Sequence, residues 1–329
     1  MVLLFSILFC AFAEIPQVDL HLDTPTQLFM KRLPWNSNTG LEASLGQLEK
    51  GGTNVPVMVL WPAKNTDPVK RAYQLLDIVE SEIGKSSRIS LARSPRDVRR
   101  IINNGSVAVI VAMEGAYGLG TDNWEQNLNT FHQRGLSMLG VTWSYSNIFA
   151  GSSGDGGGGV TSEGWKLIAK SQELGIVLDV SHASREATLQ ICKKSPVPVI
   201  ASHSDCHSVT KHPRNLTDDE IRCIAKTGGV IGINFHAPFI GKSADIKKVA
   251  DHADHLALIG GYQVVALGSD FDGYIRKPLG LEDASKLNDL WAELKQRGWT
   301  EQQINDLRGE NFLRAWEKVL ANRQFKVTE

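Results

Sequence analysis

Eight short apolar runs recur along the 329-residue chain, and most of them end on a polar or ionisable residue. The runs are rich in β-branched residues and largely continuous, which is typical of strands buried on both faces of a parallel sheet. They cover residues 17–23, 54–61, 106–114, 138–144, 176–182, 197–203, 230–236 and 264–270. This pattern predicts a fold built around a parallel sheet.

Segments with helical character lie between these runs. Examples are residues 67–85, 123–135, 161–175, 184–194, 217–228 and 246–260. Ser184 and Thr217 are suitable N-cap residues with acidic residues close behind, and several segments end at glycine. Alternating strands and helices indicate βαβ units. Eight strands in one chain favour a closed (β/α)8 TIM barrel, a fold that occupies a single domain at this length.

An open doubly wound sheet is the alternative architecture. Its nucleotide-binding version is disfavoured because no GxGxxG motif follows the first run. In a (β/α)8 barrel, the active site lies at the C-terminal ends of the strands. Here the runs end in His21 and Asp23, Glu114, Ser144, His182, His203, His236 and Asp270. The sequence therefore predicts a functional site at one rim of the barrel.

Five of these residues form a candidate metal-ligand set. His21 and Asp23 are two positions apart, so their side chains leave a strand on the same side. His182 and His203 end consecutive strands and could reach a second metal together. Glu114 has two carboxylate oxygens and could bridge both ions. Zinc accepts imidazole and carboxylate ligands, and paired ions lie roughly 3.5–4 Å apart. The pattern predicts two Zn²⁺ ions per chain.

Two further residues have candidate roles in catalysis. Asp270 follows the eighth run, and a carboxylate beside two cations can take up and return a proton. Asp272 could share this role, although Asp272 and Gly273 also suit a turn. Arg214 lies in the loop after the sixth run, on the active-site side, and could bind a carboxylate with two hydrogen bonds. The alternative for Arg214 is a solvated surface side chain.

Charge and the N-terminal segment limit the cellular context. The net charge is −1 without a basic block, which argues against a nucleic-acid partner. Residues 1–13 are almost wholly apolar, too short to span a bilayer, and contain a small-x-small cleavage pattern. We interpret this segment as a signal peptide for periplasmic export or secretion, with a cytoplasmic location as the alternative. Residues 14–329 would form one barrel domain without a transmembrane span.

Several motifs in order resemble the membrane dipeptidase (renal dipeptidase) family of zinc metallopeptidases, which have amidohydrolase-like barrels. The matching segments are 18–25 (VDLHLDTP), 114–115 (EG), 159–161 (GVT), 178–182 (LDVSH), 202–204 (SHS), 212–217 (HPRNLT), 268–273 (GSDFDG) and 309–314 (GENFLR). They extend from the first predicted strand almost to the C-terminus, so the resemblance covers nearly the whole chain.

The resemblance implies a specific distribution of roles. His21 and Asp23 would bind one zinc, His182 and His203 the other, and Glu114 would bridge them. The substrates would be dipeptides, often with a D-residue at the C-terminal position, attacked by a metal-bridging hydroxide. The chain would form a homodimer. By the same resemblance, Arg214 would grip the substrate carboxylate and Asp270 would transfer the proton.

Two positions depart from the pattern of the mammalian members. Trp143 stands where they have a histidine that polarises the scissile carbonyl, and His236 stands where they have a tyrosine. Trp143 can donate one N–H but cannot carry charge, and His236 could provide a substitute donor. We therefore expect both to contact the substrate. The alternatives are another binuclear amidohydrolase that opens lactams or lactones, and a homologue that binds metal without turnover.

Overall fold

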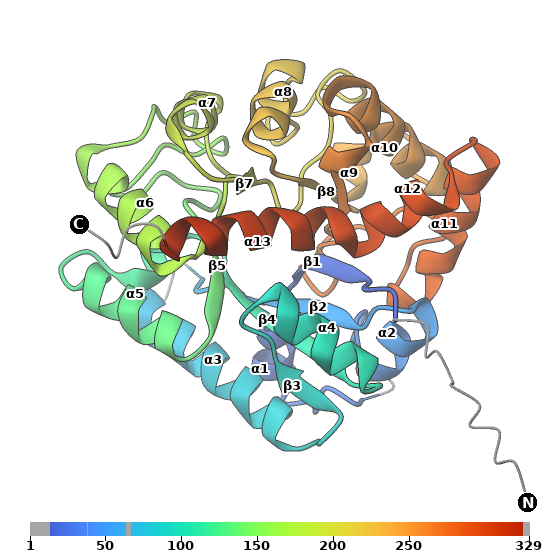
Figure 1. The fold of residues 1–329 in the computed structure, drawn as a ribbon, viewed down its shortest axis with the longest axis horizontal. Helices are drawn as coiled ribbons and strands as arrows, with labels where there is room; N and C mark the ends of the chain where they lie inside the picture. Colours follow the sequence, from blue (N-terminus) through green and yellow to red (C-terminus); the bar gives the residue numbers. More distant parts are fainter. Residues whose placement is uncertain (1–13, 38, 64–66, 325–329) are drawn as a thin grey trace, which may run out of the picture.

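The computed structural model describes residues 14–37, 39–63 and 67–324 (Figure 1). A curled parallel sheet forms its centre, and helices surround it. The strands are β1 (Val18–Leu22), β2 (Val55–Leu60), β3 (Ile89–Leu91), β4 (Val107–Met113), β5 (Leu136–Gly140), β6 (Val177–Asp179), β7 (Val199–Ile200), β8 (Ile231–Ile233) and β9 (Val265–Leu267).

Eight of these strands close into a barrel. The strands pair in parallel in the order β1-β2-β4-β5-β6-β7, and β8 pairs with β9. Two single parallel bridges complete the ring: Ala201 with Ile231 joins β7 to β8, and Leu22 with Phe271 joins β9 to β1. The predicted (β/α)8 barrel is confirmed, and the chain does not form the open doubly wound sheet.

Helices follow most strands and form the outer layer of the barrel. They are α1 (Thr24–Lys31), α2 (Leu45–Gly51), α3 (Pro68–Gly84), α4 (Pro95–Asn103), α5 (Trp124–Gln133), α6 (Ser162–Leu174), α7 (Arg185–Lys194), α8 (Asp218–Thr227), α9 (Ala237–Ile240), α10 (Ile246–Gly260), α11 (Leu287–Gln296), α12 (Glu301–Asn305) and α13 (Asn311–Gln324). Shorter helical turns are η1 (Ala116–Leu119), η2 (Tyr262–Val264), η3 (Ala284–Lys286) and η4 (Asp306–Glu310).

Local sequence signals determine where several helices begin and end. Glu220 accepts a hydrogen bond from the backbone N–H of Thr217 (2.8 Å) at the start of α8. The Ser184 hydroxyl accepts a backbone N–H of the first turn of α7 (3.0 Å). Gly175 and Gly228 end α6 and α8 in the left-handed conformation, with φ of 76° and 82°. These caps fix the residues at which the helices begin and end, and so the lengths of the loops that join them to the strands.

Helix α13 closes the N-terminal mouth of the barrel. Figure 1 shows it crossing in front of the strands rather than joining the ring. Phe312, Trp316 and Val319 are fully buried and belong to the same apolar cluster as the strand residues Leu20 and Ile110. Burial of side chains this large provides several kcal/mol, at roughly 25 cal/mol per Å² of apolar surface. The barrel therefore has a sealed end opposite its functional end.

Polar side chains at the start of α13 tie it to the barrel. The Asn311 side chain donates to the carbonyl of Val265 (2.9 Å). The Arg314 guanidinium donates to the carbonyls of Gly228 and Gln263 (2.9 Å each). These carbonyls lie at the beginnings of β8 and β9, so the 309–314 motif fixes the helix against the N-terminal strand ends.

Some features differ from the sequence prediction. β3 was not predicted, and it pairs with the first half of β4 outside the main path of the sheet. Most strands are shorter than the predicted runs, because the last residues of each run leave the sheet to present their side chains. The predicted leader, residues 1–13, lies outside the described residues. Among the described helices, none has the length and apolar character needed to cross a bilayer.

Candidate metal centre

The C-terminal ends of the strands enclose a cavity of about 320 Å³. Eight of the nine predicted site residues line it: Asp23, Glu114, Trp143, His182, His203, Arg214, His236 and Asp270. The ninth, His21, is buried beside them. The structure thus brings together side chains that are up to 249 positions apart in the sequence, from His21 to Asp270.

Glu114 lies at the centre of the predicted ligands. Its Oε1 is 2.8 Å from Nε2 of His182, 3.4 Å from Nε2 of His203 and 3.7 Å from Nε2 of His21. The Nε2 atoms of His182 and His203 are 3.0 Å apart, and Oδ2 of Asp23 is 3.8 Å from Nε2 of His21. Residues at the ends of β1, β4, β6 and β7 therefore direct nitrogen and oxygen atoms at one small volume.

Burial controls the charge state of this group. It lowers the pKa of His21 to about 3 and that of His203 well below its usual value, so the imidazoles are neutral and have a free lone pair. Burial also raises the pKa of Glu114, and the charges of Asp23 and Asp270 raise it further. The charge of Arg214 opposes this rise in the pKa of Glu114 but does not cancel it.

The arrangement fits divalent cations. Nε2 of His21 and Oδ1 of Asp23 are buried and have no hydrogen-bond partner within the described protein. One donor atom each from His21, Glu114 and His203 lies within 4.8 Å of the others, and the same holds for His21, Asp23 and Asp270. Imidazole nitrogen and carboxylate oxygen are the ligands that zinc and similar ions bind. A bound metal would satisfy these buried ligand atoms, which have no hydrogen-bond partner among the described residues and lie in a cluster of acidic side chains.

Asp270 lies beside the predicted ligands, in a left-handed backbone conformation (φ 65°). Its Oδ2 accepts a hydrogen bond from the side-chain amide of Asn234 (3.0 Å). Burial raises the pKa of Asp270 to about 7, against the lowering effect of that hydrogen bond. Asp272 is bonded instead to the Thr24 hydroxyl and the Glu42 backbone N–H (2.7 Å each). The structure therefore gives Asp272 a role in holding the loop and leaves Asp270 facing the cavity.

Arg214 is a buried side chain in the cavity wall, not a solvated one. It donates to the carbonyls of Ser181 and His203, the latter at 3.1 Å, and lies 5.5 Å from the centre of the Phe239 ring. Burial lowers its pKa, opposed by the charges of Glu114 and other nearby carboxylates. Its Nε has no hydrogen-bond partner among the described residues. A fixed guanidinium in this position is suited to a carboxylate ligand.

Trp143 forms part of an aromatic wall on the His182 side of the cavity. Its ring centre is 5.1 Å from that of Trp61, 5.6 Å from that of Tyr145 and 6.3 Å from that of His182. The indole stands close enough to the predicted ligands to touch a small molecule bound there.

His236 lines the cavity at the start of α9. Its Nδ1 accepts the backbone N–H of Arg276 (3.2 Å), and burial lowers its pKa to about 4. A neutral imidazole with Nδ1 as acceptor carries its proton on Nε2. The side chain can therefore act as a hydrogen-bond donor through Nε2.

Sequence reasoning missed a buried layer beneath the predicted ligands. Asp179 accepts four hydrogen bonds, two from the backbone N–H groups and two from the hydroxyls of Ser181 and Ser202. Asp19 similarly accepts the N–H and hydroxyl of Ser269. The available signal was an aspartate inside an apolar strand run, which is costly to bury without a role.

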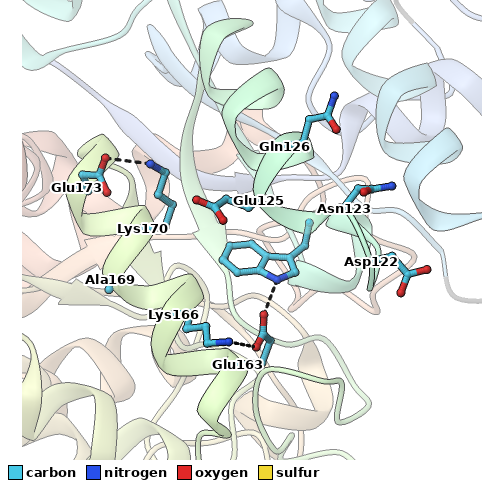
Figure 2. A pocket seen from close by; sticks show the side chains of 10 residues that line it. Asp122, Asn123, Glu125, Gln126, Glu163, Lys166, Ala169, Lys170 and Glu173 are labelled. Atoms are coloured by element: carbon cyan, nitrogen blue, oxygen red, sulfur yellow. Dashed lines mark hydrogen bonds and ion pairs between the residues drawn. The ribbon is translucent and has the colours of Figure 1, made fainter.

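A larger surface hollow of about 690 Å³ lies between α5 and α6 and shares no residue with the cavity (Figure 2). The Trp124 indole donates to Glu163 (2.7 Å). Figure 2 shows the same carboxylate paired with Lys166. Lys170 pairs with Glu173 on the same helix (2.9 Å). None of the residues that line the hollow, all of which the structure describes, contributes a buried side-chain atom without a hydrogen-bond partner, in contrast to the cavity.

Comparison with protein families gives an independent result. The family model described as membrane dipeptidase (peptidase family M19) matches residues 11–327. A curated relative, dipeptidase verJ of Clonostachys rogersoniana, is 33% identical over 93% of this chain and 85% of its own length.

Solved structures agree with the family match. The crystal structure of a metallopeptidase named dipeptidase AC has a TM-score of 0.86 and 28% identity, and the match covers 93% of this chain and 99% of that one. A metallopeptidase from Rhodobacter sphaeroides, bound to a phosphinate mimic of L-Ala-D-Ala, has a TM-score of 0.85 and 27% identity over the same shares.

Proposed function

Since the chain belongs to the membrane dipeptidase family, peptidase family M19, and is thus a metallo-dipeptidase, we propose that it hydrolyses dipeptides with two zinc ions held at the C-terminal mouth of the barrel. His21 and Asp23 would hold one ion and His182 and His203 the other, with Glu114 shared between them. The observation that carries this proposal is the convergence of three Nε2 atoms on Glu114 Oε1, within 2.8–3.7 Å.

When bound, the zinc pair would supply the positive charge that makes hydroxide available from water near neutral pH and polarises the scissile carbonyl. The protein side chains account for the remaining steps. Asp270 takes the proton that the attacking water releases and gives it to the leaving amine. Asn234 holds one oxygen of that carboxylate, and the Asp270 side chain lines the cavity.

Arg214 selects short substrates. Its guanidinium is held by backbone carbonyls at a fixed position in the same cavity as the ligands, so it would bind the C-terminal carboxylate of a dipeptide. A longer peptide would place its carboxylate too far from the reacting bond. Trp143 and His236 would contact the rest of the substrate, His236 through its Nε2–H.

We further propose that the enzyme accepts a D-residue at the C-terminal position. The support is the Rhodobacter sphaeroides metallopeptidase, which binds a phosphinate mimic of L-Ala-D-Ala and has the same fold at 27% identity. We also propose that residues 14–329 act as one catalytic domain and, from the family resemblance, as a homodimer. Light scattering on the purified protein would test the oligomeric state.

A dipeptide library with L- and D-residues at each position, assayed on zinc-reconstituted protein, tests the activity. We expect hydrolysis of free dipeptides but not of tripeptides. His203→Ala should have a lower zinc content and no activity. Asp270→Asn should keep its zinc content, and its kcat should fall strongly. Full zinc content without hydrolysis of any dipeptide would contradict the proposal and support a homologue that binds metal without turnover. Faster opening of lactams or lactones would support another amidohydrolase.

A further inference from the structure

We propose that Ser202 is a positioning residue that presents one imidazole of each zinc site in the tautomer that binds metal. The inference rests on the ligand assignment proposed above. It concerns a hydroxyl that lies behind the ligands and does not itself reach the cavity, since Ser202 is buried and absent from the cavity lining.

The Ser202 hydroxyl touches two histidines from different strands. Its Oγ is 2.8 Å from Nδ1 of His203 and 3.2 Å from Nδ1 of His21. It also lies 2.6 Å from Oδ2 of Asp179 and 3.2 Å from the hydroxyl of Ser181. One oxygen atom thus contacts a proposed ligand of the first zinc and a proposed ligand of the second.

Counting donors and acceptors fixes the hydrogens. Asp179 only accepts, so Ser202 must give its single hydrogen to Asp179. The Ser181 hydroxyl donates its own hydrogen to the other oxygen of Asp179 (2.6 Å) and has none left for Ser202. The two lone pairs of Ser202 are then free for N–H donors, and the two donors within reach are Nδ1 of His21 and Nδ1 of His203.

Both imidazoles therefore carry their proton on Nδ1. Their Nε2 atoms keep a lone pair and face Glu114, at 3.7 Å from His21 and 3.4 Å from His203. A neutral imidazole binds metal through its unprotonated nitrogen, and the partner of the other nitrogen sets which one that is. Ser202 would thus prepare both sites before any ion arrives.

The sharing of one oxygen makes a specific prediction about the two sites. Removing the hydroxyl should weaken both zinc ions, because each loses the acceptor that fixes one of its imidazoles. Loss of a partner behind a ligand typically costs 10–100-fold in metal affinity. A residue that only stabilised the barrel would not lower two affinities selectively.

The test is zinc titration of metal-free Ser202→Ala against a chromogenic chelator, which gives both dissociation constants. Ser181→Ala is the matched control, because it removes a buried hydroxyl from the same Asp179 cluster that contacts neither imidazole ring. We expect both zinc affinities of Ser202→Ala to fall 10–100-fold, with those of Ser181→Ala close to the parent. Equal effects in the two variants, or weakening of one site alone, would overturn the inference.

A second measurement needs no variant. Long-range ¹H–¹⁵N spectra of the metal-free protein with labelled histidine report which ring nitrogen is protonated, and we expect Nδ1 for both His21 and His203. An Nε2–H tautomer at either residue would overturn the inference. His203→Ala separates the two proposals: if this variant binds both zinc ions as tightly as the parent, the ligand assignment fails and the proposed function fails with it.

Discussion

The two mouths of the barrel differ in the kind of side chain that fills them. The N-terminal mouth is sealed by α13, whose Phe312, Trp316 and Val319 are fully buried against strand residues, and whose polar groups at the helix start are paired with backbone carbonyls. The C-terminal mouth holds neutral imidazoles, carboxylates with raised pKa values and buried atoms without partners. The sealed end rests mainly on apolar packing, with the buried Nε1 of Trp316 lacking a partner among the described residues, whereas the open end gathers several unpaired ligand atoms near one cavity.

The contrast indicates where stability and activity reside. Unpaired polar atoms and like charges in a buried site cost stability unless a ligand satisfies them. Apolar packing at the far end can offset that cost without entering the chemistry. Substitutions at the two mouths should therefore have effects of different kinds, and four of them test this division.

The largest effect is expected for Glu114→Gln. An amide removes a charged ligand shared by both proposed sites, so kcat/KM should fall by at least about 10³-fold, comparable to the loss of a key electrostatic group. The metal-free variant should melt at a higher temperature than the parent at pH 7, because a buried carboxylate beside Asp23 and Asp270 is gone. Calorimetry measures the melting temperature, and dipeptide assays measure kcat/KM. A lower melting temperature would contradict the idea that buried carboxylates at the open mouth destabilise the metal-free protein.

Trp316→Ala should act in the opposite way. Truncating a fully buried aromatic side chain typically costs about 3–5 kcal/mol of unfolding free energy. The kcat/KM of the folded fraction should stay at the parent value, since the residue lies at the sealed mouth. Urea unfolding and steady-state kinetics measure the two quantities. Trp143→Ala is the matched control, because the same substitution at the open mouth should impair activity more than stability.

Arg214→Lys should raise KM about 10–100-fold, equivalent to roughly 1.4–2.7 kcal/mol, because an ammonium cannot reproduce two parallel hydrogen bonds to a carboxylate. A dipeptide amide provides the control, as it lacks the carboxylate. Parent and variant should hydrolyse the amide at similar, low efficiency. A large difference between them on the amide would show that Arg214 acts through something other than the substrate carboxylate.

The smallest effect is expected for Trp143→Phe. Phenylalanine keeps the aromatic contact with Trp61 but removes the indole N–H, and one neutral hydrogen bond is worth about 0.5–1.5 kcal/mol. The expected fall in kcat is therefore about 2- to 12-fold, with little change in KM. Steady-state kinetics on one dipeptide series would measure it, and a loss above 100-fold would assign Trp143 a much stronger role.

The sequence was sufficient to predict the barrel and the grouping of the site. Apolar runs identified the eight barrel strands, and the residue that ends each run sits at the same mouth because parallel strands share an orientation. Glu114, His182 and His203 converge for this reason. The role of Asp272 was harder to predict, because it follows the same strand run as Asp270 and lies two positions further on. Its hydrogen bonds to Thr24 and Glu42 distinguish it from Asp270.

The layer beneath the ligands could not be predicted in the same way. Asp179 and Ser202 are 23 positions apart, and Asp19 and Ser269 are 250 apart. Their pairing depends on the register of neighbouring strands, which no local pattern encodes. The closure of the N-terminal mouth by α13 is likewise a long-range packing result, because an amphipathic helix at the end of the chain could equally have joined the outer ring.

The way the barrel closes has a mechanical consequence. The proposed zinc ligands follow β1, β4, β6 and β7, which belong to one continuous sheet, whereas Asn234, His236 and Asp270 follow the separate β8–β9 pair. Backbone hydrogen bonds join that pair to the rest of the barrel on both sides: Gly232 N–H donates to the Ala201 carbonyl (2.8 Å), and Asp270 N–H donates to the His21 carbonyl (3.0 Å). Asp270 and His21 are thus tied by a backbone hydrogen bond, although they belong to different parts of the sheet. The closure of the barrel therefore sets the spacing between the proposed proton acceptor and the first proposed zinc site.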